Sequence, residues 1–422
     1  MSTPRQPWGH RWRSSQWFTV MAMATALFTD TFLYSFLVPI LPYVIEDRLG
    51  LKTSSTQTIT FWLLAESAGI SVVASPIFGH FADKSGSNRA WLLWGLAIVL
   101  TSTVFVALAT SLAQLFLARL WQAIASSIIW VVGLSTVADT VHTEHMGKTF
   151  GLISLAVALG SSVGPMLSGV VFELAGYWAA WSTAFVIIGI DIALRLLMLE
   201  RRSGVRSGHT NGPAAEQASL LSNQDNRAIP ATEERTGLSF YTCILSKSNL
   251  LGGMYCNFIF GLLLTAFDAT LPLHVREVFH WGSVPAGLMF GALQAPGIVM
   301  APIIGWLKDR VGTRDPAVFA FTLLAPLFWL LGIAGTDLFP WAKQWGSVLY
   351  VLCMVSIGII STFLNGSGTI EATLTVEQLE KEHPGLFGPH GGTFVGPILA
   401  GGLRDQFGYY VLNCVVGWLR KC

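Results

Sequence analysis

Gly79-His-Phe-Ala-Asp83-Lys84-Ser-Gly86 follows the second long apolar run of this chain, and Gly305-Trp-Leu-Lys-Asp309-Arg310-Val-Gly312 follows the eighth. Both stretches read G-x-x-x-D-[KR]-x-G, at an offset of 226 residues. A second pair, Gly164-Pro165-Met-Leu-Ser-Gly169 and Gly396-Pro397-Ile-Leu-Ala-Gly401, recurs in the same order at an offset of 232. Two motifs that recur in one order at nearly one offset predict two related halves, with a site between them near the membrane midplane.

The composition predicts an all-α polytopic membrane protein. Hydrophobic residues make up 52% of the 422 residues and charged residues 12%, about half the share of a soluble domain. The net charge of +1 gives no reason to expect nucleic acid as a partner. The sequence has no P-loop, no G-x-S-x-G and no clustered metal ligands, so we expect no enzyme activity, no metal and no cofactor.

Ten segments are long and apolar enough to cross a bilayer, which takes about 20 residues. They are 17–44, 58–81, 90–109, 112–137, 149–172, 178–199, 249–272, 284–306, 316–336 and 345–369. Two shorter candidates follow near 393–403 and 409–419. We therefore predict a cytosolic lead (1–16), a six-helix half (17–199), a polar disordered linker (200–248) and a second half (249–422).

Lysine and arginine predict the orientation. With a cytosolic N-terminus, 18 of these residues fall on the cytosolic side and 5 on the other. By the positive-inside rule both termini and the linker are cytosolic.

The eleventh and twelfth helices are expected to be shortened. Residues 385–397 are rich in Gly and Pro, where the corresponding part of the first half is a long apolar run. The last apolar run, 411–418, covers only about 12 Å as a helix.

The repeated G-x-x-x-D-[KR]-x-G stretch resembles the signature loop of the major facilitator superfamily. Arg119-Leu-Trp-Gln122 resembles the R-x-x-Q motif of that family. The strip Gly160, Gly164, Pro165 and Gly169 resembles the helix motif of its drug:proton antiporter branch, with Gly396, Pro397 and Gly401 as counterparts. The stretch 30–42, which ends Val-Pro-Ile-Leu-Pro, resembles the first span of vesicular monoamine transporters and their fungal relatives.

The resemblance implies two pseudo-symmetric six-helix bundles in a monomer. It also implies proton-coupled antiport that exports or sequesters a small organic compound, amine-like or drug-like, across a plasma, vacuolar or vesicular membrane. Its partners would be that substrate, protons and the lipid bilayer. A uniporter or symporter for a neutral solute such as sugar is the alternative within transport. A non-transporting receptor or an inactive truncated isoform is the alternative outside it.

Carboxylates inside the spans are the first candidate site residues. Asp30 lies in a span without Lys or Arg, so its carboxylate should face the bundle interior. There it would meet a cationic substrate or a proton. The alternative is a structural carboxylate near a helix end. Asp268, near the far end of the seventh span, and Glu371, at the end of the tenth, match family carboxylates. Glu66 stands in the second span where the resembled transporters carry lysine. A buried acid can exchange a proton for a bound cation. Structural pairing or an interfacial, solvated position is the alternative for Asp268 and Glu371.

Basic and aromatic residues complete the candidates. Arg119 beside Gln122 would assist proton coupling, or would snorkel to the interface. Asp191 and Arg195, four apart on one helix, predict a structural pair. Five aromatics could form a cation-binding cage, although packing is the commoner role: Trp121, Trp130, Phe260, Phe267 and Phe290.

The repeated motif predicts a latch between access states rather than a substrate contact; a solvated positive-inside loop is the alternative. A tight glycine turn in each loop would present a carboxylate to a neighbouring helix end. The gating residues are Gly79, Asp83, Lys84, Gly86 and Arg89 in the first half, and Gly305, Asp309, Arg310 and Gly312 in the second. The small residues of the Gly160–Gly169 strip would let helices approach closely.

Overall fold

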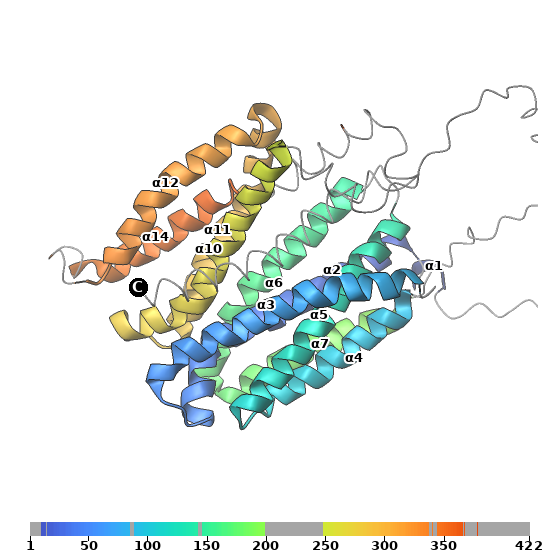
Figure 1. Cartoon of the computed structure of the whole chain (residues 1–422), viewed down its shortest axis with the longest axis horizontal. Helices are drawn as coiled ribbons and strands as arrows, with labels where there is room; N and C mark the ends of the chain where they lie inside the picture. Colours follow the sequence, from blue (N-terminus) through green and yellow to red (C-terminus); the bar gives the residue numbers. More distant parts are fainter. Residues whose placement is uncertain are drawn as a thin grey trace, which may run out of the picture.

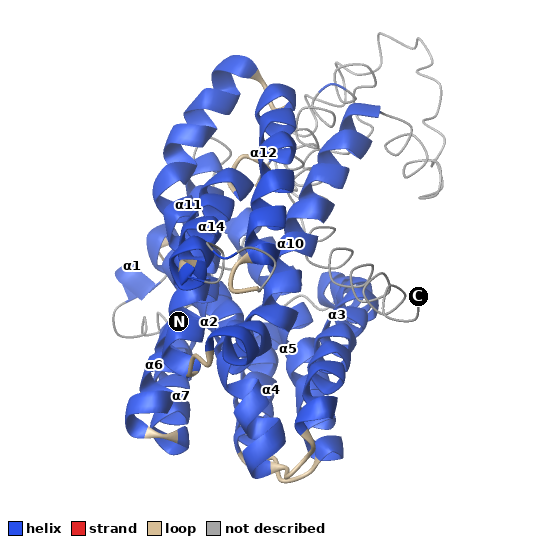
Figure 2. Ribbon diagram, turned by 90° about the vertical axis from the view of Figure 1, so that its left-hand side faces the viewer, coloured by secondary structure: helices blue, strands red, loops and turns tan. Residues whose placement is uncertain are grey.

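A computed structural model describes residues 10–13, 15–84, 88–141, 146–198, 248–336, 340, 344–365, 367 and 378. Every regular element within these ranges is helical (Figure 2). The six helices of the first half and four of the second form two neighbouring bundles (Figure 1).

The first half contains a short helix, α1 (His10–Arg13), and six long helices. These are α2 (Gln16–Tyr43), α3 (Thr53–Lys84), α4 (Asn88–Ala107), α5 (Leu112–Thr140), α6 (Met146–Ala175) and α7 (Tyr177–Leu197). The helix α2 continues directly into a π-helix, η1 (Val44–Arg48). Most residues of α2 are buried, because it packs against α5, α6 and α7 and also reaches the second half.

The second half contains α10 (Ser248–Phe279), α11 (Ser283–Val311), α12 (Arg314–Ile333) and α14 (Gly346–Ser361). Figure 2 shows these four helices grouped on one side of α2–α7. We call the end of the protein at which α2 meets η1 the η1 end, and the end at which α3 terminates the Lys84 end.

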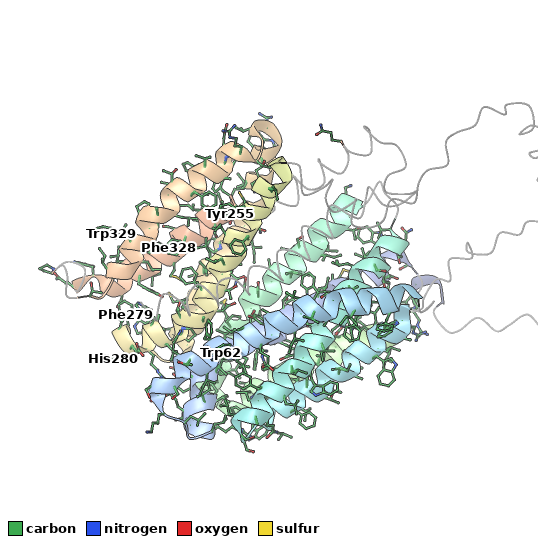
Figure 3. All side chains as sticks on the ribbon, in the orientation of Figure 1. Trp62, Tyr255, Phe279, His280, Phe328 and Trp329 are labelled. Atoms are coloured by element: carbon green, nitrogen blue, oxygen red, sulfur yellow. The ribbon has the colours of Figure 1, made fainter. Side chains whose placement is uncertain are left out.

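Nine of the described helices are long and apolar enough to cross a membrane, and α14 is a shorter apolar helix. Most of these helices begin and end within a few residues of the ten predicted spans. Two helices end elsewhere than predicted: α10 extends to Phe279, beyond residue 272, and α14 ends at Ser361, before residue 369. Large aromatic side chains stand on the outside, as lipid permits: Trp329 of α12 is 60% exposed and lies on the outer face in Figure 3. The predicted linker and the shortened last helices lie outside the described residues.

Helix α6 joins the two halves through its glycines. A Cβ added to Gly160 would lie 2.6 Å from the carbonyl oxygen of Phe28, and one added to Gly164 would lie 2.7 Å from that of Phe32. On the other side of α6, a Cβ on Gly169 would collide with the carbonyl oxygen of Ser283 on α11. Backbone therefore touches backbone on both sides of α6, which only glycine permits.

The first glycine of each repeated motif does not form a tight turn. Gly79 lies inside α3 and Gly305 inside α11, where both are helical and a Cβ would meet no close contact. The turn comes later, at Gly312, whose φ of +86° ends α11 and favours glycine. Gly79 and Gly305 are therefore not at turns, because α3 continues to Lys84 and α11 to Val311.

We expect Gly164→Ala to destabilise the protein by about 1–3 kcal/mol, because its methyl group would push α6 away from α2. Gly151→Ala on the same helix is the control, since a Cβ there meets nothing within 4 Å. The measurement is thermal unfolding in detergent. Equal unfolding temperatures for the two variants would contradict the close packing at Gly164.

Candidate functional site

Asp30 of α2 lies against one face of α5. Its Oδ2 accepts hydrogen bonds from Ser126 Oγ at 2.7 Å and from Trp130 Nε1 at 2.9 Å. Ser126 and Trp130 are four residues apart, so they share one face of α5. Asp30 is 8% exposed. The sequence analysis did not single out Ser126, although its spacing to Trp130 on a predicted helix was available as a signal.

The same face of α5 carries Arg119 and Gln122 farther toward its N-terminus. Arg119 is 2% exposed and donates from Nη1 to Gln122 Oε1 at 2.8 Å. Its guanidinium lies 5.2 Å from the ring of Tyr34, one turn after Asp30 on α2. The structure thus brings Arg119, Gln122 and Asp30 to one polar stripe between α2 and α5.

Glu66 of α3 joins this stripe. Its carboxylate interacts electrostatically with Arg119. Its Oε2 is buried and has no hydrogen-bond partner within the described part of the chain. A buried carboxylate oxygen without a hydrogen-bond partner is costly.

Asp268 lies deeper in its helix than predicted. The sequence reading placed it near the end of a span that stopped at Pro272, but α10 continues for seven residues beyond that proline. A proline inside a membrane helix is tolerated where neighbouring helices compensate, which explains the error. Asp268 is half-buried, and the next residue, Ala269, accepts a hydrogen bond from Gln57 of α3.

Several predicted residues cannot be placed. Glu371, Gly86, Gly396, Pro397 and Gly401 lie outside the described residues. Asp83 and Lys84 lie at the end of α3 and Asp309 near the end of α11, but their side chains are not among the described ones. Arg89 is the second residue of α4 and is half-buried, and the guanidinium of Arg310 lies 4.2 Å from the centre of the Trp306 ring.

Asp191 and Arg195 form the predicted pair. Two hydrogen bonds of 2.9 and 2.6 Å join the guanidinium to the carboxylate, and Arg195 also donates to the carbonyl oxygen of Leu92 on α4. Both residues are 1% exposed, so the pair cross-links α7 and α4 inside the first half.

The five aromatics do not form a cage. Trp121 is 47% exposed, while Phe260, Phe267 and Phe290 belong to the hydrophobic core of the second half. Only Trp130 stands beside Asp30. Aromatic side chains pack at many places in a helical bundle. The sequence alone therefore could not predict which of them lie together.

An ion pair joins the two halves at the η1 end. Arg276 of α10 donates to Glu46 Oε1 of η1 at 2.6 Å, and Thr56 of α3 donates to the same oxygen at 2.7 Å. The guanidinium of Arg276 also lies 5.9 Å from the ring of Tyr43. Sequence reasoning missed this pair, because 230 residues separate its members.

Helices α6 and α11 add further contacts between the halves. Glu173 Oε2 accepts from the backbone N–H of Val284 at 2.7 Å, at the η1 end. Nearer the middle of α6, Ser161 Oγ donates to Gln294 Oε1 at 2.6 Å, and the Gln294 amide donates back to the Ser161 carbonyl oxygen. These contacts extend from the middle of α6 to its C-terminal end.

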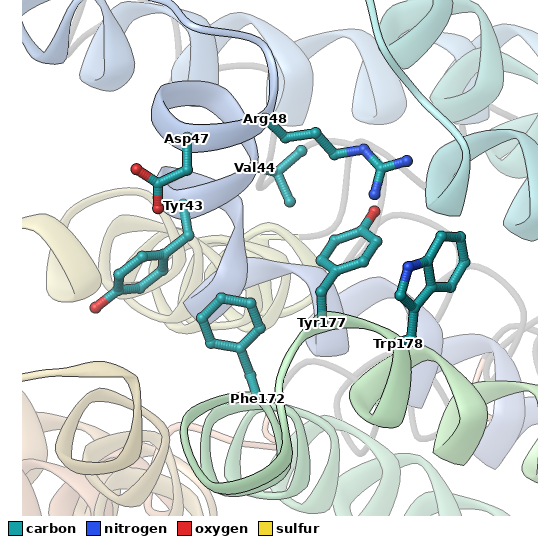
Figure 4. A pocket seen from close by; sticks show the side chains of 7 residues that line it. All are labelled: Tyr43, Val44, Asp47, Arg48, Phe172, Tyr177 and Trp178. Atoms are coloured by element: carbon teal, nitrogen blue, oxygen red, sulfur yellow. The ribbon is translucent and has the colours of Figure 1, made fainter.

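A hollow of about 310 Å³ opens between η1, α6 and α7 (Figure 4). It is lined by Tyr43, Val44, Asp47, Arg48, Phe172, Tyr177 and Trp178. The guanidinium of Arg48 lies 4.5 Å from the ring of Tyr177 and 5.6 Å from that of Trp178, so the chain itself covers these rings. The hollow contains none of the predicted site residues.

A polar stripe inside a two-half helical bundle is the arrangement expected of a membrane transporter. The family model described as Major Facilitator Superfamily matches residues 23–386. The chain belongs to this family. Its members are transporters rather than enzymes, and this chain is an integral multi-pass membrane protein.

Individual relatives agree with the family. The chain is 31% identical over 417 residues to the uncharacterised MFS-type transporter C18.02 of Schizosaccharomyces pombe, covering 94% of this chain and 92% of that one. A shorter match of 29% over 161 residues, 37% of this chain and 32% of the relative, is to "Probable vesicular acetylcholine transporter-B" of Danio rerio. The structure of a bacterial homologue of the human lysosomal transporter Spinster shares the fold, with a TM-score of 0.69, 13% identity and coverage of 96% and 82%.

We expect Glu46→Gln and Arg276→Gln each to loosen the η1 end. Loss of an ion pair that is partly exposed should cost about 1 kcal/mol and speed local opening about fivefold. Hydrogen–deuterium exchange over residues 44–57 measures this opening. Arg48→Gln is the control, because the hydrogen bond of Arg48 to Ala109 and its ring contacts stay within the first half. Exchange that is equally fast in all three variants would contradict a specific role for the pair.

Proposed function

We propose that this protein is a proton-coupled antiporter that exports or sequesters a small organic cation by alternating access. The observation that carries the proposal is Asp30, a nearly buried carboxylate in a membrane helix whose two hydrogen-bond donors on α5 are both neutral. Hydrogen bonds from neutral donors fix the position of the carboxylate. The partial similarity to an acetylcholine transporter supports an organic cation as the cargo.

Proton coupling is assigned to the other acids near the stripe. Glu66 has a buried unpaired oxygen and an arginine on the neighbouring helix, so it can exchange a proton as Arg119 changes partner. Asp268 of α10 would contribute from the second half. Antiport follows when a cation at Asp30 and a proton at these acids favour opposite access states.

Alternating access requires the contacts between the halves to break and re-form. Glu46 pairs with Arg276 at the η1 end, and Glu173 accepts a hydrogen bond from Val284 there. With the orientation predicted from Lys and Arg, we assign these contacts to a latch on the non-cytosolic side. We assign Asp83 and Asp309, at the Lys84 end, to the opposite latch.

We expect Asp30→Asn to lower the transport efficiency for cations by about tenfold to a hundredfold, because a hydrogen bond or ion pair to a charged group is worth about 1.5–3 kcal/mol. Transport of neutral compounds should change little, and the pH dependence of cation binding should flatten. Uptake into vesicles with an imposed pH gradient measures both effects.

Asp47→Asn is the matched control, since Asp47 is exposed at the surface of η1. Unchanged cation affinity and unchanged pH dependence in Asp30→Asn would assign this carboxylate a structural role only.

We expect a cysteine placed in the linker (Ser219→Cys) to react with a membrane-impermeant maleimide only after the cells are permeabilised. A cysteine at the exposed position Ser54 near the η1 end should react in intact cells if the protein resides in the plasma membrane. In sealed vacuoles or vesicles the linker cysteine should be the reactive one. Reaction of both positions from one side of a sealed membrane would overturn the topology.

A further inference from the structure

The hollow between η1, α6 and α7 contains two opposite charges that do not pair with each other. Asp47 and Arg48 are neighbours in η1, and both line the hollow. Figure 4 shows their side chains pointing apart, Asp47 on the side of Tyr43 and Arg48 toward Tyr177. Within the described residues Asp47 takes part in no ion pair. A carboxylate and a guanidinium in one hollow suit a ligand that carries both charges.

The guanidinium of Arg48 is held in a fixed position by the first half. Its Nε donates to the carbonyl oxygen of Ala109 at 2.9 Å, and its face lies 4.5 Å from the centre of the Tyr177 ring. Its two terminal nitrogens donate to no residue of the described ranges. Stacking uses the face of a guanidinium and leaves its N–H edge available, and this edge is the part that binds phosphate oxygens.

The hollow lies at the level where two membrane spans end. The span that contains η1 ends at Arg48, and the span of α7 begins at Tyr177. Leu174 and Trp178 are exposed there, at 79% and 57%, as lipid contact permits. Phospholipid headgroups occupy this level of a bilayer. A volume of about 310 Å³ is small for a ligand pocket, so it suits a headgroup and leaves the acyl chains outside.

The aromatic rings of the hollow favour a primary over a quaternary ammonium group. Arg48 covers two of the four rings, and the guanidinium of Arg276 lies 5.9 Å from a third, that of Tyr43. The fourth ring, of Phe172, packs against Tyr43 with the centroids 5.1 Å apart. A quaternary ammonium ion needs an open ring face, whereas a primary ammonium ion can donate hydrogen bonds to the carboxylate of Asp47.

We propose that this hollow binds the headgroup of phosphatidylethanolamine, with the phosphate at Arg48 and the primary ammonium group at Asp47. In the orientation predicted from Lys and Arg, the lipid belongs to the non-cytosolic leaflet. The site is separate from the polar stripe at Asp30, and its occupant does not depend on the identity of the cargo.

Native mass spectrometry of the purified full-length protein tests the proposal, with phosphatidylethanolamine and phosphatidylcholine of identical acyl chains as probes. The unsubstituted protein should bind the ethanolamine lipid about threefold to tenfold more tightly. Asp47→Asn should abolish this preference, and Arg48→Gln should weaken both lipids about threefold to tenfold. Equal affinities of the unsubstituted protein for the two lipids overturn the proposal, even if Arg48→Gln fails to fold. A preference that survives in Asp47→Asn also overturns it.

Glu277→Gln and Lys52→Gln are the matched controls, because both residues are exposed at the η1 end but do not line the hollow. Both variants should bind the two lipids as the unsubstituted protein does. A loss in either control as large as that in Asp47→Asn or Arg48→Gln would assign the binding to general surface charge and refute the site. Free phosphoethanolamine separates the sources of the headgroup: if it binds as tightly as the lipid, the occupant is a soluble zwitterion and the lipid assignment is wrong.

Discussion

The close backbone contacts that three glycines of α6 allow are the constraint on which the arrangement of this protein depends. In lipid, helices gain little from burying apolar side chains, so close van der Waals contact has to hold them together. Gly160 and Gly164 bring α6 against the backbone of α2, and Gly169 brings it against α11. One helix thereby fixes the distance between Asp30 on α2 and the second half. The polar contacts of α6 with α11, made by Ser161 and Glu173, form where these glycines allow a close approach.

Three acids in the first half illustrate how surroundings separate roles. Asp191 meets Arg195 in a fully buried pair and can only hold helices together. Glu46 meets Arg276 across the two halves, where the pair is partly exposed and can open. Asp30 accepts hydrogen bonds from two neutral donors on α5. Equal side-chain chemistry therefore yields a structural link, a contact between halves and a candidate binding group.

The sequence predicted what depends on composition and short spacing. Apolar run length placed the helices, and positions three and four apart placed Arg119 beside Gln122 and Asp191 beside Arg195. Errors arose where tertiary contacts override local signals. Pro272 suggested a helix end, but packing lets α10 continue to Phe279. The pair of Glu46 and Arg276 has no local signal at all, because each residue alone resembles an ordinary charge near a span end.

The binding group and the contact between the halves share their helices. On the first-half side, Asp30 lies in α2 and Glu46 in the π-helix that continues it; on the second-half side, Asp268 and Arg276 both lie in α10. Any rigid movement that separates Glu46 from Arg276 must therefore displace α2, α10 or both. Either displacement moves a candidate carboxylate relative to α5. Pro39, Pro42 and the π-helix mark where α2 departs from regular hydrogen bonding, so bending is least costly there. In the proposed function, occupation of the site at Asp30 would thus be connected to the contact of Glu46 with Arg276 through two continuous helices.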